Sequence, residues 1–480
     1  MSSNASPATA GKAARIGLWL GPLWLLITLL APAPAGLSDP AWACVGLALL
    51  MATWWATEAL PIPATALLPL ALAPPLGITE MGRTASAYAN PVVFLFFGGF
   101  LLGLAMQHWH LHRRLALQVL RLVGAKPRRQ IGGFMIATGF LSMWVSNTAT
   151  AIMMLPIGMS VISLLDGGDE REVNRYATAL LLAIAYAASI GGVATLIGTP
   201  PNSLLAGYLS DNQGIELGFA QWMIVGVPIS VTMMLFAWWW LTRGGFKLDN
   251  ENSDTMIRDE LAKMGPISRA EKRVAIIFAL AALTWIARPL LVHRYGLDWL
   301  SDTGIAIAAG LLMFLIPSGG RRGERLLTWE AARDLPWGVL LLFGGGLSLA
   351  AAISDSGLAQ WIAEQLQVLE GFPILVLIGL VVLVILFLTE VTSNTATAAA
   401  FLPLLGALAV SQNISPLLAT VPAALAASCA FMMPVATPPN AIVFAAGHMR
   451  IQSMIRAGFV LNLVAAVLIT LLALPLMKLM

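Results

Sequence analysis

The sequence Ser-Asn-Thr-Ala-Thr occurs at residues 146–150 and again, letter for letter, at residues 393–397. Each copy lies in a long apolar stretch. Residues 130–165 carry no charged side chain, and residues 372–410 carry only Glu390. A straight helix over 130–165 would run roughly 54 Å, nearly twice the ~30 Å hydrocarbon core of a bilayer. The sequence therefore predicts two re-entrant hairpins, with the polar residues at their tips.

A second motif, Thr-Pro-Pro-Asn, follows each hairpin, at residues 199–202 and 437–440. Both copies lie inside charge-free runs, 176–210 and 411–447. Proline lacks a backbone N–H and disfavours a helical conformation in the residue before it. Each run is therefore predicted to be a helix broken within the membrane, with Pro-Pro opening its second half.

These motifs point to ion binding. Ser, Asn and Thr are common N-cap residues, so each hairpin tip begins a new helix. Two hairpins and two broken helices would bring four helix N-termini together, whose free N–H groups favour an anion. The half-helices that end before the tips expose carbonyl oxygens, which suit Na⁺. Ser142 and Thr389 each precede a tip serine by four residues and add oxygens on the same helix face. Anion and cation sites are thus expected side by side, in duplicate.

The composition restricts the class of protein. Of the 480 residues, 58% are hydrophobic and 11% are charged, with a mean hydropathy of +0.82. Apolar runs recur along the whole chain, which predicts an all-α polytopic membrane protein, because a membrane β-barrel would show short alternating segments. Neither HExxH nor GxSxG occurs, and no nucleophile–base pair stands out, so no enzyme is expected. Cys44 and Cys429 lie in apolar runs and indicate no disulfide framework.

About eleven transmembrane helices are expected in addition to the two hairpins. Residues 1–40 would comprise a disordered N-terminus and an uncleaved first helix, and the charged stretch 243–273 would be a cytoplasmic loop. Two amphipathic segments, near 111–129 and 358–370, precede the hairpins. The expected spans are about 12–35, 41–57, 60–77, 91–107, 176–210, 219–242, 274–292, 300–317, 337–353, 411–447 and 457–477.

The order of these segments occurs twice. Span, amphipathic helix, hairpin, broken helix and final span form repeat 1 (41–242) and repeat 2 (274–480). With the N-terminus inside, 23 of the 27 lysines and arginines fall on one side of the membrane. The positive-inside rule therefore predicts a cytoplasmic N-terminus and an outside C-terminus. The hairpins then open on opposite faces, so the repeats have inverted topology, which is typical of secondary transporters.

The same motifs carry a resemblance to a family. Ser-Asn-Thr at each tip, followed by Thr-Pro-Pro-Asn, resembles the divalent anion/sodium symporter family, which includes bacterial dicarboxylate transporters. The stretches 57–61 (Thr-Glu-Ala-Leu-Pro), 141–144 (Leu-Ser-Met-Trp) and 389–390 (Thr-Glu) match its habits too. The resemblance covers nearly all of the chain past residue 40. It implies sodium-coupled symport of C4-dicarboxylate dianions such as succinate, malate and fumarate, across a bacterial inner (plasma) membrane.

The resemblance also implies roles for residues. It implies a first Na⁺ site of Ser142, Ser146, Asn147 and the Gly198 carbonyl, and a second of Thr389, Ser393, Asn394 and the Ala436 carbonyl. It implies substrate contacts from Asn147, Thr148, Thr199, Pro200, Asn394, Thr395, Thr437 and Pro438. It further implies a homodimer with an elevator mechanism. The scaffold would be approximately 1–128 and 274–371, and the transport domain approximately 129–242 and 372–480.

Several alternatives remain open at this point. A channel would need a continuous polar pore instead of two capped pockets, and the inverted repeats favour alternating access. Within the transporters, a dicarboxylate exchanger or a carrier of citrate or sulfate is the second reading. Glu390 fits either a proton or cation site, or a structural partner of backbone donors. Glu58 is expected at the membrane interface.

Overall fold

The computed structural model describes residues 12–165, 169–248, 251–320, 323–365 and 373–479. Within these ranges the regular elements are helices, apart from one isolated bridge between Pro317 and Arg325. The helices are α1 Lys12–Leu30, α2 Asp39–Thr57, α3 Ile62–Thr65, α4 Leu68–Leu72, α5 Met81–Ser86, α6 Pro91–His108, α7 Leu111–Val123, α8 Pro127–Ser142, α9 Asn147–Ser163, α10 Glu170–Val193, α11 Pro200–Gln213, α12 Phe219–Thr242, α13 Glu251–Lys263, α14 Arg269–Tyr295, α15 Asp302–Leu315, α16 Trp337–Asp355, α17 Leu358–Gln365, α18 Ile374–Leu388, α19 Asn394–Ser411, α20 Leu417–Ala427, α21 Pro438–Ala445 and α22 Ile451–Met477, with short 3-10 turns at Ala87–Ala89 and Ala331–Asp334.

The expected all-α membrane fold is confirmed. Nine helices in the described ranges are long and apolar enough to cross a bilayer: α1, α2, α5–α6 counted as one, α10, α12, α14, α16, α19 and α22. Eight of these are expected spans, and α19 is an arm of the second hairpin. The other three expected spans are shorter apolar helices, because prolines divide α3 from α4 and α20 from α21, and because α15 ends at Leu315.

Both hairpins form where the sequence predicts them. The first consists of α8 and α9, and its tip ends at Ser146, whose Oγ accepts the Ala149 N–H at 3.2 Å and so caps α9. The second consists of α18 and α19, with Ser393 at the N-cap position of α19. Each turn thus falls on the repeated polar residues, because Ser, Asn and Thr are residue types that favour the start of a helix.

Both predicted helix breaks are present, and they share one backbone conformation. Between α10 and α11, Thr199 is extended (φ −144°, ψ 141°), and between α20 and α21, Thr437 is extended (φ −140°, ψ 149°). The second half-helices begin directly afterwards, at Pro200 and Pro438. Proline at the first helical position loses no hydrogen bond, because that N–H has no intrahelical acceptor.

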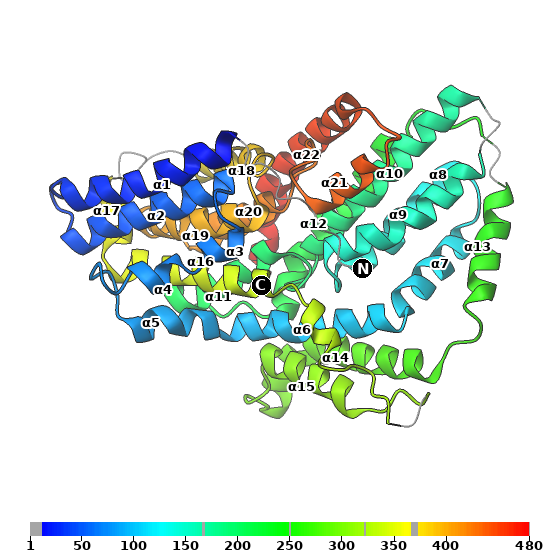
Figure 1. Cartoon of the computed structure of the whole chain (residues 1–480), viewed down its shortest axis with the longest axis horizontal. Coiled ribbons are helices and arrows are strands. Elements are labelled where there is room, and N and C mark those ends of the chain that lie inside the picture. The colour runs from blue at the N-terminus through cyan, green and yellow to red at the C-terminus, as the bar shows by residue number, and fades with distance from the viewer. Residues whose placement is uncertain (1–11, 166–168, 249–250, 321–322, 366–372, 480) are drawn as a thin grey trace.

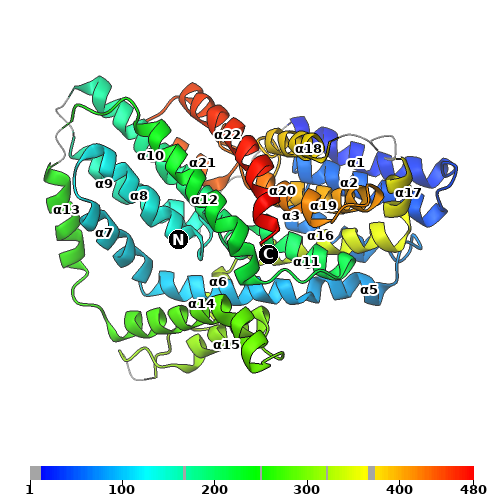
Figure 2. The same cartoon turned by 180° about the vertical axis from the view of Figure 1, so that it is seen from behind.

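The two repeats interlock through their broken helices. α10 packs on its own hairpin (α8 and α9), whereas α11 packs on α19 and α20 of the other repeat. Likewise α20 packs on α18 and α19, whereas α21 packs on α9 and α10. Each second half-helix therefore crosses into the opposite repeat. Both views show α8, α9 and α10 on one side of the molecule and α16, α17 and α19 on the other (Figures 1 and 2).

The amphipathic segments are helical as far as the structure describes them. α7 is amphipathic and leads from α6 into the first hairpin. Its buried Arg114 pairs with Glu271 at 2.7 Å, which ties α7 to the first turn of α14. α17 covers 358–365, and the remainder of the segment expected up to residue 370 lies outside the described residues.

Candidate functional site

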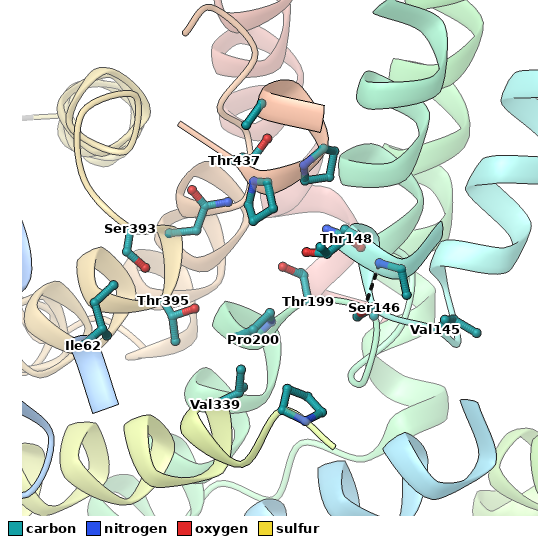
Figure 3. A pocket seen from close by; sticks show the side chains of 18 of the residues that line it. Ile62, Val145, Ser146, Thr148, Thr199, Pro200, Val339, Ser393, Thr395 and Thr437 are labelled. Carbon is teal, nitrogen blue, oxygen red and sulfur yellow. Dashed lines mark hydrogen bonds between the residues drawn. The ribbon is translucent and has the colours of Figure 1, made fainter. Parts of the chain in front are cut away.

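A cavity of about 960 Å³ lies where the two hairpin tips and the two helix breaks meet. All eight residues expected to contact substrate line it: Asn147, Thr148, Thr199, Pro200, Asn394, Thr395, Thr437 and Pro438. Figure 3 shows the threonines at 148, 199, 395 and 437 arranged with Ser393 around one space. The N-termini of α9, α11, α19 and α21 therefore contribute to a single cavity, as the repeated motifs predict.

The first expected cation site forms a cluster of oxygen atoms beside this cavity. Ser142 is fully buried, and its Oγ lies 2.6 Å from the Ala188 carbonyl oxygen of α10. The Asn147 amide lies between Ser142 Oγ (2.5 Å), the Ala188 oxygen (3.1 Å) and the Gly198 oxygen (3.2 Å), to all of which its NH₂ can donate. Turned the other way, the amide presents Oδ1 to the same oxygens. This donor set suits a hard cation such as Na⁺.

Two glycines of α10 permit this close approach. A Cβ on Gly192 would lie 2.7 Å from Asn147 Oδ1 and 2.9 Å from the Gly198 oxygen. A Cβ on Gly191 would lie 2.3 Å from the Gly139 carbonyl oxygen of α8. The hairpin and the broken helix can therefore share these oxygens only because neither glycine carries a side chain.

The second repeat builds the corresponding cluster. Thr389 is fully buried, and its Oγ1 lies 2.7 Å from Asn394 Oδ1 and 3.0 Å from the Ala427 carbonyl oxygen. Ala436, whose carbonyl is an expected ligand, lines the cavity beside Asn394. In both repeats a hydroxyl on the first hairpin arm thus meets the tip asparagine and a carbonyl of the broken helix.

The charge of the cavity is unusual for a site expected to hold a dianion. Among the described residues that line it, none is lysine or arginine, and the two charged residues, Glu58 and Asp334, are acidic. Attraction for an anion must therefore come from backbone N–H groups at helix N-termini, from hydroxyl groups and from bound cations.

The comparison of the chain with known families agrees with this geometry. Residues 16–479 match the family model described as the sodium:sulfate symporter transmembrane region. The chain belongs to this symporter family. It is 46% identical over 466 residues to the sodium-dependent dicarboxylate transporter SdcS of Staphylococcus saprophyticus, covering 95% of this chain and 90% of that protein. It is 44% identical over 483 residues to SdcS of Staphylococcus aureus strain USA300, covering 98% and 92%.

Two solved structures share the fold of this symporter-family chain at low sequence identity. The Alcanivorax borkumensis YdaH transporter aligns with a TM-score of 0.59 and 16% identity, covering 96% of this chain and 98% of that one. Neisseria gonorrhoeae MtrF aligns with a TM-score of 0.55 and 12% identity, covering 98% and 95%. At these identities the likeness concerns the arrangement of helices and carries no information on the substrate.

Two asparagine side chains stabilise the two helix breaks of this chain. Asn202 Nδ2 donates to the carbonyl oxygens of Gly192 (3.3 Å), Val193 (3.2 Å) and Thr195 (2.8 Å). Asn440 Nδ2 donates to those of Ala430 and Met433, both at 3.1 Å. These side chains replace hydrogen bonds that the interrupted helices lose. The expected site residues do not include them, although the repeated motif contains both.

The structure also adds residues from the opposite wall of the cavity. Thr57, Glu58 and Gln107 line it, together with Asp334 at the end of the 3-10 turn before α16. Glu58 has a left-handed backbone (φ 50°) at the end of α2, which is uncommon for a residue with a side chain. The expectation of a merely interfacial Glu58 is therefore incomplete, because this residue lies at the cavity.

The structure shows the hydrogen-bond partners of Glu390. Its carboxylate is 3% exposed and accepts five hydrogen bonds. Four come from the N–H groups of residues 431–433, at 2.7–3.1 Å, and one from Asn462 Nδ2 at 2.7 Å. It is a partner of backbone donors in the second helix break.

Proposed function

We propose that the chain is a secondary active transporter that couples Na⁺ to the movement of a C4-dicarboxylate dianion such as succinate, malate or fumarate. The observation that carries this proposal is the pairing of two buried oxygen clusters with one cavity, which is lined by four helix N-termini. The relatives named as sodium-dependent dicarboxylate transporters support both ligands.

The transported species would be the doubly charged acid. One carboxylate would accept hydrogen bonds at the first tip, from Asn147 and Thr148, and the other at the second tip, from Asn394 and Thr395. The helix breaks would add Thr199, Pro200, Thr437 and Pro438. The sodium ions would be held by Ser142, Ser146, Asn147 and Gly198, and by Thr389, Ser393, Asn394 and Ala436. Each cation would then lie next to a helix end that also contacts the anion, which supports coupled binding.

The proposal includes how the protein moves and where it resides. The hairpins and broken helices would form a transport domain, approximately 129–242 and 372–480, that moves as an elevator. The scaffold, approximately 1–128 and 274–371, would hold it within a homodimer. The protein would reside in the bacterial inner (plasma) membrane, with its N-terminus in the cytoplasm. The distribution of lysines and arginines supports this orientation.

Uptake by proteoliposomes tests the function. Purified protein is reconstituted, and entry of labelled succinate is measured under an inward Na⁺ gradient and with K⁺ in its place. We expect uptake with Na⁺, none above protein-free liposomes with K⁺, and inhibition by unlabelled malate and fumarate. A counterflow experiment without an ion gradient identifies a carrier. Liposomes loaded with unlabelled succinate transiently accumulate labelled succinate if a carrier exchanges the two, and a channel cannot produce this accumulation.

Additional conditions separate the alternatives. Sulfate and citrate serve as competitors, because the family model is described by sulfate. Equal uptake in Na⁺ and K⁺ that depends on internal dicarboxylate would show an exchanger and refute sodium coupling. Inhibition by sulfate but not by malate or fumarate would refute the dicarboxylate assignment.

A further inference from the structure

The two helix breaks are anchored to their hairpins by different chemistry. In the first repeat, Thr195 Oγ1 donates to the Met143 carbonyl oxygen at 2.5 Å, so a neutral bond joins the break to the tip. Glu390 lies 247 residues after Met143, which is the spacing of the two tip serines. The position of a neutral methionine in the first repeat therefore carries a carboxylate in the second.

The Glu390 carboxylate is buried and hydrogen-bonded, and it has no basic partner among the residues that the structure describes. Its acceptor oxygens are occupied by the N–H groups of residues 431–433 and by Asn462. Among the described residues, no lysine or arginine forms an ion pair with it. Backbone dipoles stabilise the charge in place but do not cancel it, so a net negative charge lies inside the second repeat.

Two segments of the chain connect this charge to the second oxygen cluster. Glu390 directly follows Thr389, whose hydroxyl is part of that cluster. The segment 431–433 that Glu390 holds leads, three residues later, to Ala436, whose carbonyl is an expected ligand. The first cluster is made of a hydroxyl, an amide and carbonyl oxygens, all uncharged. A cation therefore gains Coulomb energy at the second cluster that the first does not supply.

We infer, on the basis of the proposed sodium coupling, that Glu390 is a positioning residue that makes the second cluster the tighter sodium site. This site fills first, before the dicarboxylate binds. Glu390 acts in two ways: it fixes the segment that carries the Ala436 carbonyl, and it contributes negative charge beside Thr389. The first cluster then fills at higher sodium concentration, together with the anion.

The order of filling is tested in the absence of dicarboxylate. Thermal stability of the detergent-purified protein is titrated with NaCl at constant ionic strength, kept constant with choline chloride, for wild type, Ser142→Ala and Thr389→Ala. We expect Thr389→Ala to raise the sodium midpoint about ten-fold or more, the factor for loss of a bond to a charged group. Ser142→Ala should leave this midpoint within about two-fold of wild type, because it affects the site that fills later. Equal effects of the two variants would overturn the inference.

The role of Glu390 is tested by the same titration with Glu390→Gln, which keeps the shape and removes the charge. We expect its midpoint to rise about five-fold, which corresponds to ~1 kcal/mol. The rise should persist when Glu390→Gln is combined with Ser142→Ala and largely disappear when it is combined with Thr389→Ala. The effects of two substitutions at one ion site are not additive. Asn462→Ala is the matched control: it removes one hydrogen bond to the carboxylate but keeps the charge, so its midpoint should stay near wild type.

The outcomes separate this inference from the proposed function. If wild type shows no stabilisation by NaCl beyond that by choline chloride, sodium coupling is refuted and the inference with it. If wild type responds but Glu390→Gln lowers stability without moving the sodium midpoint, Glu390 is purely structural and only the inference fails. If Glu390→Gln does not fold, the sodium midpoint of Asn462→Ala tests the role of charge: a shift as large as that of Thr389→Ala would refute it. The comparison of Ser142→Ala with Thr389→Ala still decides the order of filling.

Discussion

Replacing Thr148 by valine and Ser142 by alanine should impair the binding of different ligands, although the two residues lie only six positions apart. Thr148 lines the cavity at the start of α9, and its hydroxyl group can reach a carboxylate. Ser142 does not line the cavity; it is fully buried, with its Oγ 2.6 Å from the Ala188 oxygen. Under the proposed assignment, the first substitution removes a contact to the anion, and the second removes an oxygen ligand of the cation.

The expected size of each effect follows from these contacts. A hydrogen bond to a charged group contributes about 1.5–3 kcal/mol, so Thr148→Val should weaken dicarboxylate binding roughly ten- to 150-fold. Valine has nearly the shape of threonine, so little of this loss should come from packing. Saturating Na⁺ should not restore it. Ser142→Ala should raise the Na⁺ concentration needed for binding, and dicarboxylate affinity should largely recover at high Na⁺, because the two ligands are linked.

The assay is a titration of purified protein with succinate at several fixed Na⁺ concentrations, in which binding is measured by calorimetry or by the shift in melting temperature. The second repeat supplies an independent pair, Thr395→Val and Thr389→Ala, which should divide in the same way. Each variant must first retain the folded state, judged by its elution volume and melting temperature. Rescue of all four variants by Na⁺, or of none, would refute the assignment of hairpin arms to the cation and tips to the anion.

Three further predictions concern packing, topology and charge. Gly191→Ala should destabilise the protein by about 1–3 kcal/mol and weaken sodium activation, because its Cβ meets the backbone of Gly139. Gly82 has open space around it, so Gly82→Ala should leave the melting temperature unchanged. A cysteine at the exposed Gln118 should react with an impermeant maleimide only from the cytoplasm, and one at Asp298 only from outside; labelling of both from one face would contradict the topology. Butyrate should compete far more weakly than succinate, by ~2 kcal/mol or more for the missing charged partner, and equal inhibition would contradict recognition of a dianion.

The hairpins and breaks could be predicted because their signals are local. A polar tip such as Ser146–Thr148 is conspicuous inside a charge-free stretch, and Pro200 and Pro438 mark the start of a helix by their own covalent geometry. The repetition of both motifs also predicted that the hairpins and the helix breaks occur in pairs. Tips and breaks that follow from the conformational preferences of their own residues were therefore found from the sequence.

The parts that could not be predicted depend on tertiary contacts. Ala188 and Ala427 contribute carbonyl oxygens, which every residue possesses, so nothing in the sequence distinguishes them. The partners of Glu390 are backbone N–H groups about 41 residues further along the chain, and they become available only because α20 has already ended. Asp334 reaches the cavity wall from the end of a four-residue 3-10 turn, which is too short for periodicity to give information.

The lack of basic side chains in the described cavity wall has a consequence for the direction in which an acid is transported. With Glu58 and Asp334 as its only charged residues, the described wall offers a free dianion only helix N-termini and hydroxyl groups until cations have bound. A wall with a fixed arginine would hold the acid at any sodium concentration and could carry it back out. Under the proposed sodium coupling, the acid is held at the sodium-rich face of the membrane and released at the sodium-poor face, so loss of the sodium gradient would also remove the direction of transport.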